Sequence, residues 1–263
     1  MTIMTADLGS LLRHWRGVRG CSQFDLSLDS GVSQRHISFI ESGRSAPSRH
    51  TLIELAQALD VPLRERNALL LAAGFAPLYS ESSWDAEEMR AVNKALARVL
   101  RQHEPFPALV MDRYWSVLTT NQAAPRFFNR FVDLAARPEP RNMLHLVFDP
   151  KGLRPFIANW EETAKSLIER VRHEAVGQVL DDRTRELLAA LQAYPGTEDG
   201  GKAKAAKPLP MIPLSFVLSG QTLNFFSMVT TVGAPRTVAA QELRLECLFP
   251  ADDESEARYL ALA

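Results

Sequence analysis

The segment from Cys21 to Pro47 constrains this chain more than any other, because its residues follow the spacing of two short crossed helices. A first helix is expected over 23–30 and a second over 33–41. Gly31 lies between them and permits the backbone geometry of a tight turn. Ser33 can cap the second helix, since its hydroxyl can accept a hydrogen bond from a first-turn amide. The segment therefore predicts a helix-turn-helix unit.

Apolar residues of the two helices are expected to face each other. Ile37 and Ile40 share one side of the second helix, three residues apart, and Leu26 and Leu28 offer apolar surface from the first. This packing leaves the polar residues of the second helix on the outside.

These outward residues have the chemistry of major-groove readers. Gln34 and Arg35 are the leading candidates, because Gln can bind adenine and Arg guanine through paired hydrogen bonds. Phe39 is expected to contact a thymine methyl, whereas Gln23 and Arg44 are expected to hold phosphate oxygens. The predicted DNA-binding residues are Gln23, Ser33, Gln34, Arg35, Ser38, Phe39 and Arg44. The alternative is that they are solvated polar positions on a small helical bundle.

Three further helices are expected around this unit. An apolar stripe marks 7–19, Ser48 can cap a helix that ends near residue 59, and Pro62 begins a helix that stops at Gly74. Five helices in residues 1–76 predict an all-α DNA-binding domain.

The pattern resembles the XRE-type, phage-repressor-like helix-turn-helix family, which implies a lambda-repressor-like fold. Most members have alanine at the position of Ser27. The residues that carry the resemblance are Ser22-Gln23, Leu26-Ser27, Gly31-Val32-Ser33, Ile37-Ser38, Ile40-Glu41-Ser42-Gly43-Arg44 and Pro47-Ser48.

Composition is that of a globular protein, with 46% hydrophobic and 23% charged residues among 263. A net charge of -1 gives no global attraction to DNA, so a reader domain must rely on a local patch. Two cysteines predict no disulfide framework. No apolar run approaches the roughly 18 residues of a spanning helix, and no signal peptide is evident, so a cytoplasmic protein without membrane contact is expected.

A linker is expected over 77–84, and residues 85–263 are expected to form a second domain of the α+β class. A long helix over 85–101 opens it. Strands are expected over 108–111, 114–120, 212–218, 222–231 and 243–249, with helices over 154–173, 181–194 and 252–262 between and after them.

From about Phe106 onward the layout resembles the MmyB-like ligand-binding domain, itself similar to PAS folds. The resemblance rests on Pro107–Trp115, Asn121–Ala124, Asn142–Leu144, Trp160, Ala164 and Arg170. It implies a sensor for a small apolar ligand such as a fatty acid. An arginine could pair an acid head group, and Arg113, Arg126 and Arg154 are the alternatives. The predicted ligand-binding residues are Trp115, Phe127, Phe128, Phe148, Trp160, Phe216 and Phe225, although aromatics at such spacing also build plain cores.

No catalytic, metal-binding or cofactor motif is found: HExxH, CxxC, a P-loop and G-x-S-x-G are all missing from the sequence. We therefore expect no enzyme, no metal and no cofactor. The predicted function is sequence-specific transcription regulation on double-stranded DNA.

A single reader module buries too little surface for tight binding, so a homodimer on an inverted-repeat operator is expected. The apolar stripe over 85–101 could form the dimer face, or it could pack on its own domain. Two alternatives remain: a protein-binding or assembly module whose helix-turn-helix does not act through a ligand, and an antitoxin, which the long second domain disfavours.

Overall fold

The chain forms two compact units in the computed structural model, which describes residues 7–174, 181–195 and 214–262. One unit comprises the residues up to Ser83 together with Ala234–Gln241, and the other comprises Trp84–Gly233 and Glu242–Ala263. The boundary after Ser83 lies within the expected linker, whereas the return of residues 234–241 to the first unit was not expected from the sequence.

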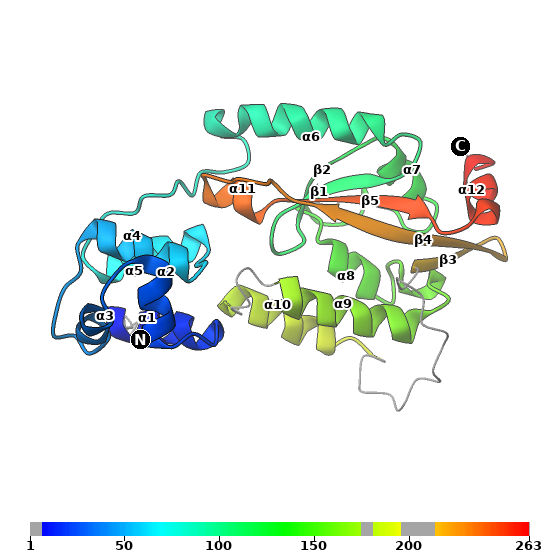
Figure 1. Ribbon diagram of the computed structural model, residues 1–263. Helices are drawn as coiled ribbons and strands as arrows, with labels where there is room; N and C mark the ends of the chain where they lie inside the picture. The colour runs from blue at the N-terminus through cyan, green and yellow to red at the C-terminus, as the bar shows by residue number, and fades with distance from the viewer. Residues whose placement is uncertain (1–6, 175–180, 196–213, 263) are drawn as a thin grey trace. The chain divides into compact units, whose positions relative to one another are not determined.

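The first unit is all-α, as predicted, and its five consecutive helices end close to the expected residues (Figure 1). Asp7, Ser22, Ser33 and Ser48 each cap a helix with the side chain. The helices are α1 (Leu8–Val18), α2 (Gln23–Ser30), α3 (Gln34–Glu41), α4 (Arg49–Ala58) and α5 (Leu63–Ala72), and α11 (Val238–Glu242) supplies the late segment.

A small apolar core fills this bundle. Its fully buried residues come from all five helices and include Leu12, Trp15, Leu26, Ile37, Ile40, Leu52, Leu55, Leu69 and Leu70. Leu28 was expected to join them, but that expectation is wrong, because Leu28 is 68% exposed. Leu26 already fills the space against α3, and Leu28, two residues on, lies on the opposite side of α2.

The second unit is built on one antiparallel sheet of five strands in the order β2-β1-β5-β4-β3. The strands are β1 (Ala108–Met111), β2 (Val117–Thr120), β3 (Leu214–Leu218), β4 (Gln221–Thr230) and β5 (Arg244–Pro250). The last strand pairs between the first and the fourth, with Val110 opposite Leu245 and Val229 opposite Glu246. This arrangement of a sheet flanked by helices confirms the predicted α+β class.

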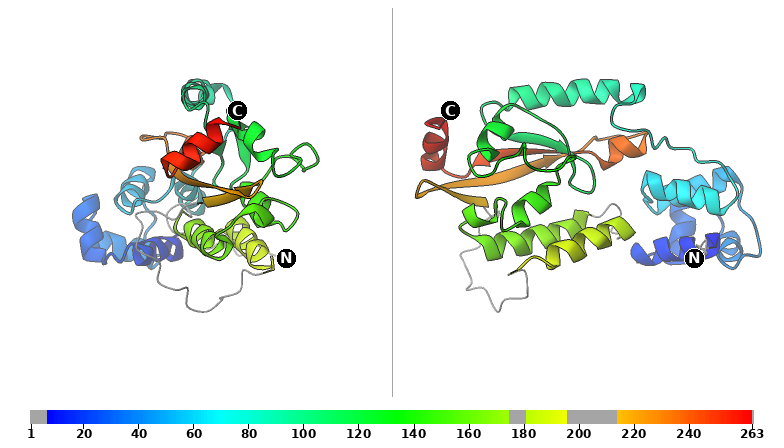
Figure 2. Two further views of the ribbon diagram at one scale, coloured as in Figure 1. Left: turned by 90° about the vertical axis from the view of Figure 1, so that its right-hand side faces the viewer. Right: turned by 180° about the vertical axis from the view of Figure 1, so that it is seen from behind.

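Helices lie on both sides of the sheet (Figures 1 and 2). A 3-10 turn (Glu87–Met89) leads into α6 on one face, and α8, α9 and α10 lie on the other. The expected helix 154–173 begins later, because Pro155 lies in a separate 3-10 turn (Arg154–Phe156). The helices are α6 (Arg90–Gln102), α7 (Ala123–Phe128), α8 (Met143–Phe148), α9 (Trp160–Glu174), α10 (Asp182–Gln192) and α12 (Asp253–Leu260).

The main core of the second unit lies between the sheet and the helices opposite α6. Leu109 and Met111 of β1 belong to this core, whereas the alternate residues Ala108 and Val110 point to the face that α6 covers. Side chains on both faces of β1 are therefore buried. Among the described helices, none combines the length and the apolar character that a bilayer crossing requires.

Candidate DNA interface and ligand pocket

The turn between α2 and α3 has the geometry that its sequence predicts. Gly31 ends α2 in the left-handed region with φ 71°, a conformation that costs glycine little. Ser22 and Asp25 form a reciprocal capping box at the start of α2. Ser33 Oγ accepts a hydrogen bond from the His36 amide at the start of α3. Local residues therefore fix where both helices begin.

A buried carboxylate fixes α3 against the two helices that precede it. Glu41 is 3% exposed and receives Arg16 Nε at 2.8 Å, Arg16 Nη2 at 3.1 Å and Gln23 Nε2 at 2.8 Å. Burial opposes ionisation of Glu41, but the hydrogen bonds from Arg16 and Gln23 outweigh it and hold the pKa of the carboxyl below its usual value. Arg13 also donates to the Glu41 carbonyl oxygen. This Glu41 network sets the angle at which α3 is presented.

The outer surface of α3 offers two free donor-rich side chains. Gln34 and Arg35 are exposed at its first turn, and neither makes a hydrogen bond or ion pair with another described residue. Two guanidinium groups lie near the ring of Phe39, with Arg35 Cζ 5.3 Å and Arg44 Cζ 5.8 Å from its centroid. The aromatic ring therefore holds both arginines close to α3.

The other predicted DNA-binding residues divide by role. Ser38 is half-buried on α3, and Ser33 is exposed at its cap. Gln23 lies at the start of α2 as expected, but its amide nitrogen is bound to Glu41. The structure thus gives Gln23 a second task, that of holding α2 to α3, which the sequence did not reveal.

In the second unit, a groove of about 260 Å³ lies between α9 and the strands β4 and β5. Arg170 and Glu246 form a two-pronged ion pair in its wall, with Nη1–Oε1 3.0 Å and Nη2–Oε2 3.3 Å. Thr163 is 4% exposed, lines the same groove, and its hydroxyl has no hydrogen-bond partner among the described residues. A buried polar atom without a partner is costly, so this hydroxyl is a candidate contact for a bound molecule.

A smaller apolar pocket adjoins the groove, since the two share four lining residues: Leu167, Leu214, Glu246 and Leu248. Its other walls come from β1, the turn that follows β1, α7 and α8, and they are almost wholly apolar: Leu109, Trp115, Phe128, Met143, Leu144 and Val147. Trp115 lies beneath Arg170, whose Cζ is 4.6 Å from its ring centroid. Groove and pocket together offer a polar rim and an apolar interior.

Only some of the predicted ligand-binding aromatics lie at this site. Trp115 and Phe128 line the apolar pocket. Phe127, Phe148, Phe216 and Phe225 are at most 1% exposed and belong to the closed core, where rings pack edge to face. Trp160 packs edge to face on Phe148, and Arg154 Cζ lies 4.8 Å from the centroid of the Trp160 ring.

The three arginines considered as head-group partners do not line the groove, whereas Arg170 does. Arg126 pairs with Glu104, and Arg154 lies over Trp160. Arg113 is buried between two carboxylates, with Nη2 2.9 Å from Asp181 and Nη1 2.9 Å from Glu242. Distance along the sequence hid the pairing of Arg170 with Glu246, which lie 76 residues apart.

The Arg113 cluster is completed by a tyrosine. Tyr114 Oη donates to Asp181 at 2.9 Å, and burial, reinforced by that carboxylate, raises the pKa of Tyr114 to about 12. Burial opposes ionisation of Asp181, but hydrogen bonds from Thr184 and Tyr114 outweigh it and lower the pKa of Asp181. At neutral pH, Asp181 is therefore ionised and Tyr114 keeps the proton that it donates to Asp181.

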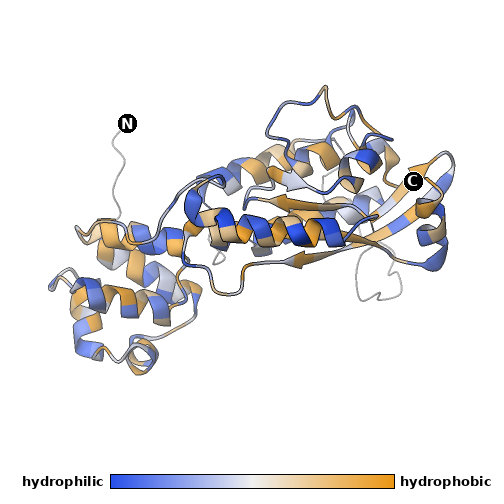
Figure 3. Cartoon of the chain, turned by 90° about the horizontal axis from the view of Figure 1, so that it is seen from above, coloured by the Kyte–Doolittle hydropathy of each residue, from blue (hydrophilic) through white to orange (hydrophobic). Residues whose placement is uncertain are grey.

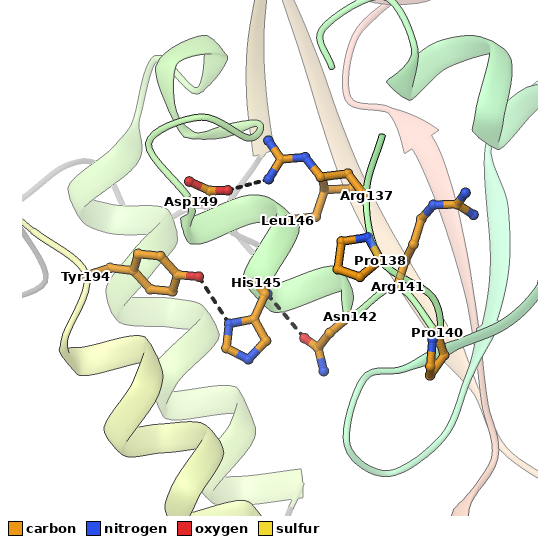
Figure 4. A pocket seen from close by; sticks show the side chains of 9 residues that line it. All are labelled: Arg137, Pro138, Pro140, Arg141, Asn142, His145, Leu146, Asp149 and Tyr194. Carbon is orange, nitrogen blue, oxygen red and sulfur yellow. Dashed lines mark hydrogen bonds and ion pairs between the residues drawn. The ribbon is translucent and has the colours of Figure 1, made fainter. Parts of the chain in front are cut away.

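A second opening of about 310 Å³ lies beside α8 (Figure 4). His145 Nδ1 is 3.2 Å from Tyr194 Oη, and Arg137 pairs with Asp149 across it. Burial lowers the pKa of His145. Among the described residues, the groove at Arg170 has a buried hydroxyl without a partner, that of Thr163, whereas no residue lining this opening has such an atom. The described residues contain no group of three or more His, Cys, Asp or Glu arranged to hold a metal ion.

Two families of known proteins match separate stretches of the chain. Residues 12–66 match the family described as helix-turn-helix, and residues 92–262 match the family described as MmyB-like transcription regulator ligand binding domain. An uncharacterized HTH-type transcriptional regulator, y4dJ of Sinorhizobium fredii (strain NBRC 101917 / NGR234), is 43% identical over 54 residues. That stretch covers 20% of this chain and 70% of the relative. The chain belongs to the MmyB-like transcription regulators and carries an XRE-type helix-turn-helix domain at its N-terminus.

Proposed function

We propose that this regulator reads an inverted-repeat DNA operator as a homodimer and that a small apolar acid, such as a fatty acid, changes its operator affinity. The observation that carries the DNA part is that Gln34 and Arg35 are exposed at the start of α3 and make no hydrogen bond or ion pair with another described residue. Donor-rich side chains at the first turn of a recognition helix reach base edges in the major groove. Such a protein acts where the chromosome is, in the cytoplasm.

Substitutions of Arg35 and Arg44 distinguish contacts to bases from contacts to phosphates. Arg35→Ala is expected to cost about 1–3 kcal/mol of binding free energy and to weaken the preference at one base pair. Arg44→Ala is expected to weaken all sequences alike and to lower the salt slope by about one unit. Fluorescence anisotropy on a duplex selected from a random pool, with each base pair substituted in turn, measures both.

The control is Lys151→Ala, since Lys151 is an exposed cation of the other unit that lies outside both the groove and α6. If binding were independent of salt, or if both α3-side variants bound as the wild type does, the protein-binding alternative would replace the DNA proposal.

The groove and its apolar pocket support the ligand part. An acyl chain can lie in the groove of about 260 Å³ against Leu167 and Leu248, while an acid group meets Arg170 and the Thr163 hydroxyl, which has no hydrogen-bond partner among the described residues. Arg170 binds a carboxylate already, that of Glu246, so its fork geometry suits an incoming acid. The ligand would then compete with Glu246 for the guanidinium.

Native mass spectrometry of the purified protein, with decanoic acid and 1-decanol as probes, tests this assignment. Decanoate is expected to bind more tightly than the alcohol, because only the acid can pair with Arg170. Leu167→Trp, which fills the junction of groove and pocket, should abolish binding, whereas Leu260→Trp on the exposed side of α12 should not. Equal binding of both probes, or of both variants, would contradict the assignment.

Helix α6 supports the dimer proposal. Met89 and Leu100 at its two ends are buried, but Val92 and Leu96 are half-buried and Val99 is 39% exposed. Hydrophobic and hydrophilic residues both lie on the outer side of this helix (Figure 3). The same mass spectra report the oligomeric state, and Val99→Glu is expected to shift a dimer toward monomer.

A further inference from the structure

The connection between β4 and β5 belongs to both units in turn. The two strands pair as far as Thr230 opposite Leu245. Beyond that pair, the segment Ala234–Gln241 folds with the first 83 residues, and Glu242 belongs to the sensor unit again. The connection between two strands of the sensor sheet therefore forms part of the DNA-binding unit. We refer to Ala234–Gln241 as the returning segment.

The returning segment is held in the first unit by burial and by two long-range hydrogen bonds. Val238 is fully buried, and its amide donates to the Ser80 carbonyl oxygen at 2.9 Å. Gln241 Oε1 accepts from the Leu63 amide at 2.7 Å. These contacts join the segment both to the start of α5 and to the chain that follows α5.

Gln241 completes the capping of α5. This helix begins after Pro62, which offers no side-chain cap, so its first amides lack partners within the helix. Gln241 supplies the missing acceptor at Leu63, the first residue of α5. Leu69 and Leu70 of the same helix lie in the core of the DNA-binding unit. The cap thus acts on a helix that supports the whole unit.

The next residue along the chain is anchored in the sensor unit. Glu242 is 8% exposed and pairs with Arg113, which in turn pairs with Asp181 at the start of α10. One peptide bond therefore joins the cap of α5 to the buried Arg113 cluster. A shift of Glu242 must move Gln241 with it.

The ligand groove lies at the same end of the two strands. Val229 and Glu246 are directly opposite each other, and both line the groove. The next pair, Thr230 and Leu245, is the last between β4 and β5. Displacing Glu246 from Arg170 would act one residue pair from that end, and three residues on each strand separate the end from the returning segment.

We propose that the returning segment transmits ligand state to the DNA-binding unit, with Gln241 as a positioning residue for α5. Arrival of an acid at Arg170 frees Glu246, shifts the adjoining ends of β4 and β5, and weakens or strengthens the Gln241 cap. The ligand step rests on the function proposed above, whereas the path from Glu242 through Gln241 to α5 does not.

Hydrogen exchange of the full chain without ligand tests the path. Gln241→Ala is expected to speed exchange in the first turn of α5 by roughly five- to tenfold, the effect of losing one cap. Gln241→Glu keeps an acceptor and should restore protection. Glu242→Gln weakens the anchor in the sensor unit and should also speed exchange in α5. Gln221→Ala, on the exposed start of β4, is the control.

Operator binding with and without decanoate then shows whether Gln241 transmits the ligand state or only stabilises α5. The wild type should change affinity on adding decanoate, and Gln241→Ala should lose that change while binding decanoate normally. Unchanged α5 exchange in Glu242→Gln, or a wild-type response in Gln241→Ala, would overturn the proposal. If the wild type does not bind decanoate, the acid-ligand proposal fails, and α5 exchange in Glu242→Gln alone decides the coupling.

Discussion

Removal of the Glu41 carboxylate is expected to loosen the helix-turn-helix without unfolding the sensor unit. In Glu41→Ala, the side chain of Arg16 loses two hydrogen bonds and Gln23 loses one. Hydrogen bonds to charged groups contribute about 1.5–3 kcal/mol each, but the three share one carboxylate and are not additive. Breaking a fully buried ion pair costs about 3–5 kcal/mol.

The free-energy cost of Glu41→Ala should be lower than that of breaking a fully buried ion pair, because Arg16 is 22% exposed and can turn toward water. We expect the free energy of opening of α1 and α3 to fall by about 2–4 kcal/mol, which accelerates hydrogen exchange roughly 30- to 700-fold. Exchange measured by mass spectrometry on peptides from residues 8–18 and 34–41 of the full chain gives this value.

The matched control is Glu54→Ala in the same unit. Glu54 pairs with His50 on the surface of α4, where His50 is 83% exposed, so the loss should be at most about 0.5 kcal/mol. If both variants exchanged at the wild-type rate, or both accelerated equally, the Glu41 network would not be what holds α3 in place.

Three further predictions follow from particular contacts. Gly9→Ala should destabilise the first unit by about 1–3 kcal/mol, because the new Cβ would overlap the Glu41 carbonyl oxygen. Gly17→Ala in the same helix places its Cβ in open space and should stabilise the unit by about 0.5–1 kcal/mol. Hydrogen exchange of α1 measures both effects. Thr163→Val should raise the denaturation midpoint of the sensor unit by removing an unpartnered buried hydroxyl, a gain of about 1 kcal/mol, and a lower midpoint would show that the hydroxyl is bonded. Glu41 has a lowered pKa in the folded state, so its stabilisation is complete above about pH 4.5 and is lost as pH falls through that lowered pKa; exchange-based stability should therefore decline more steeply in acid for the wild type than for Glu41→Gln.

The sequence predicts the DNA-binding unit well because its determinants are local. Ser22, Gly31 and Ser33 act on residues three or four positions away, so helix ends can be recognised without knowledge of the fold. Leu28 was misplaced, because residues two positions apart lie on opposite sides of a helix and only one of Leu26 and Leu28 can face α3.

The ligand site depends on long-range pairing and was predicted only in part. Phe127 and Phe128 are neighbours, yet the first lies in the closed core and the second lines the pocket. Nothing in their local sequence distinguishes them. Arg170 faces Glu246 only because β5 pairs between β1 and β4, a topology that no local pattern encodes.

The returning segment had no sequence signal at all. Its Gln241 caps a helix that begins 178 residues earlier, and α11 is a single short turn without a distinctive apolar pattern. Contacts of this kind become visible only when the complete chain is folded.

The most direct test of ligand-controlled operator binding is the affinity of the protein for its selected operator, measured at fixed salt with and without saturating decanoate. We expect the operator affinity to change by at least about fivefold, the lower end of ordinary coupling between two sites. Equal affinities for ligand-free and ligand-loaded protein, with decanoate binding verified in the same samples, would contradict it.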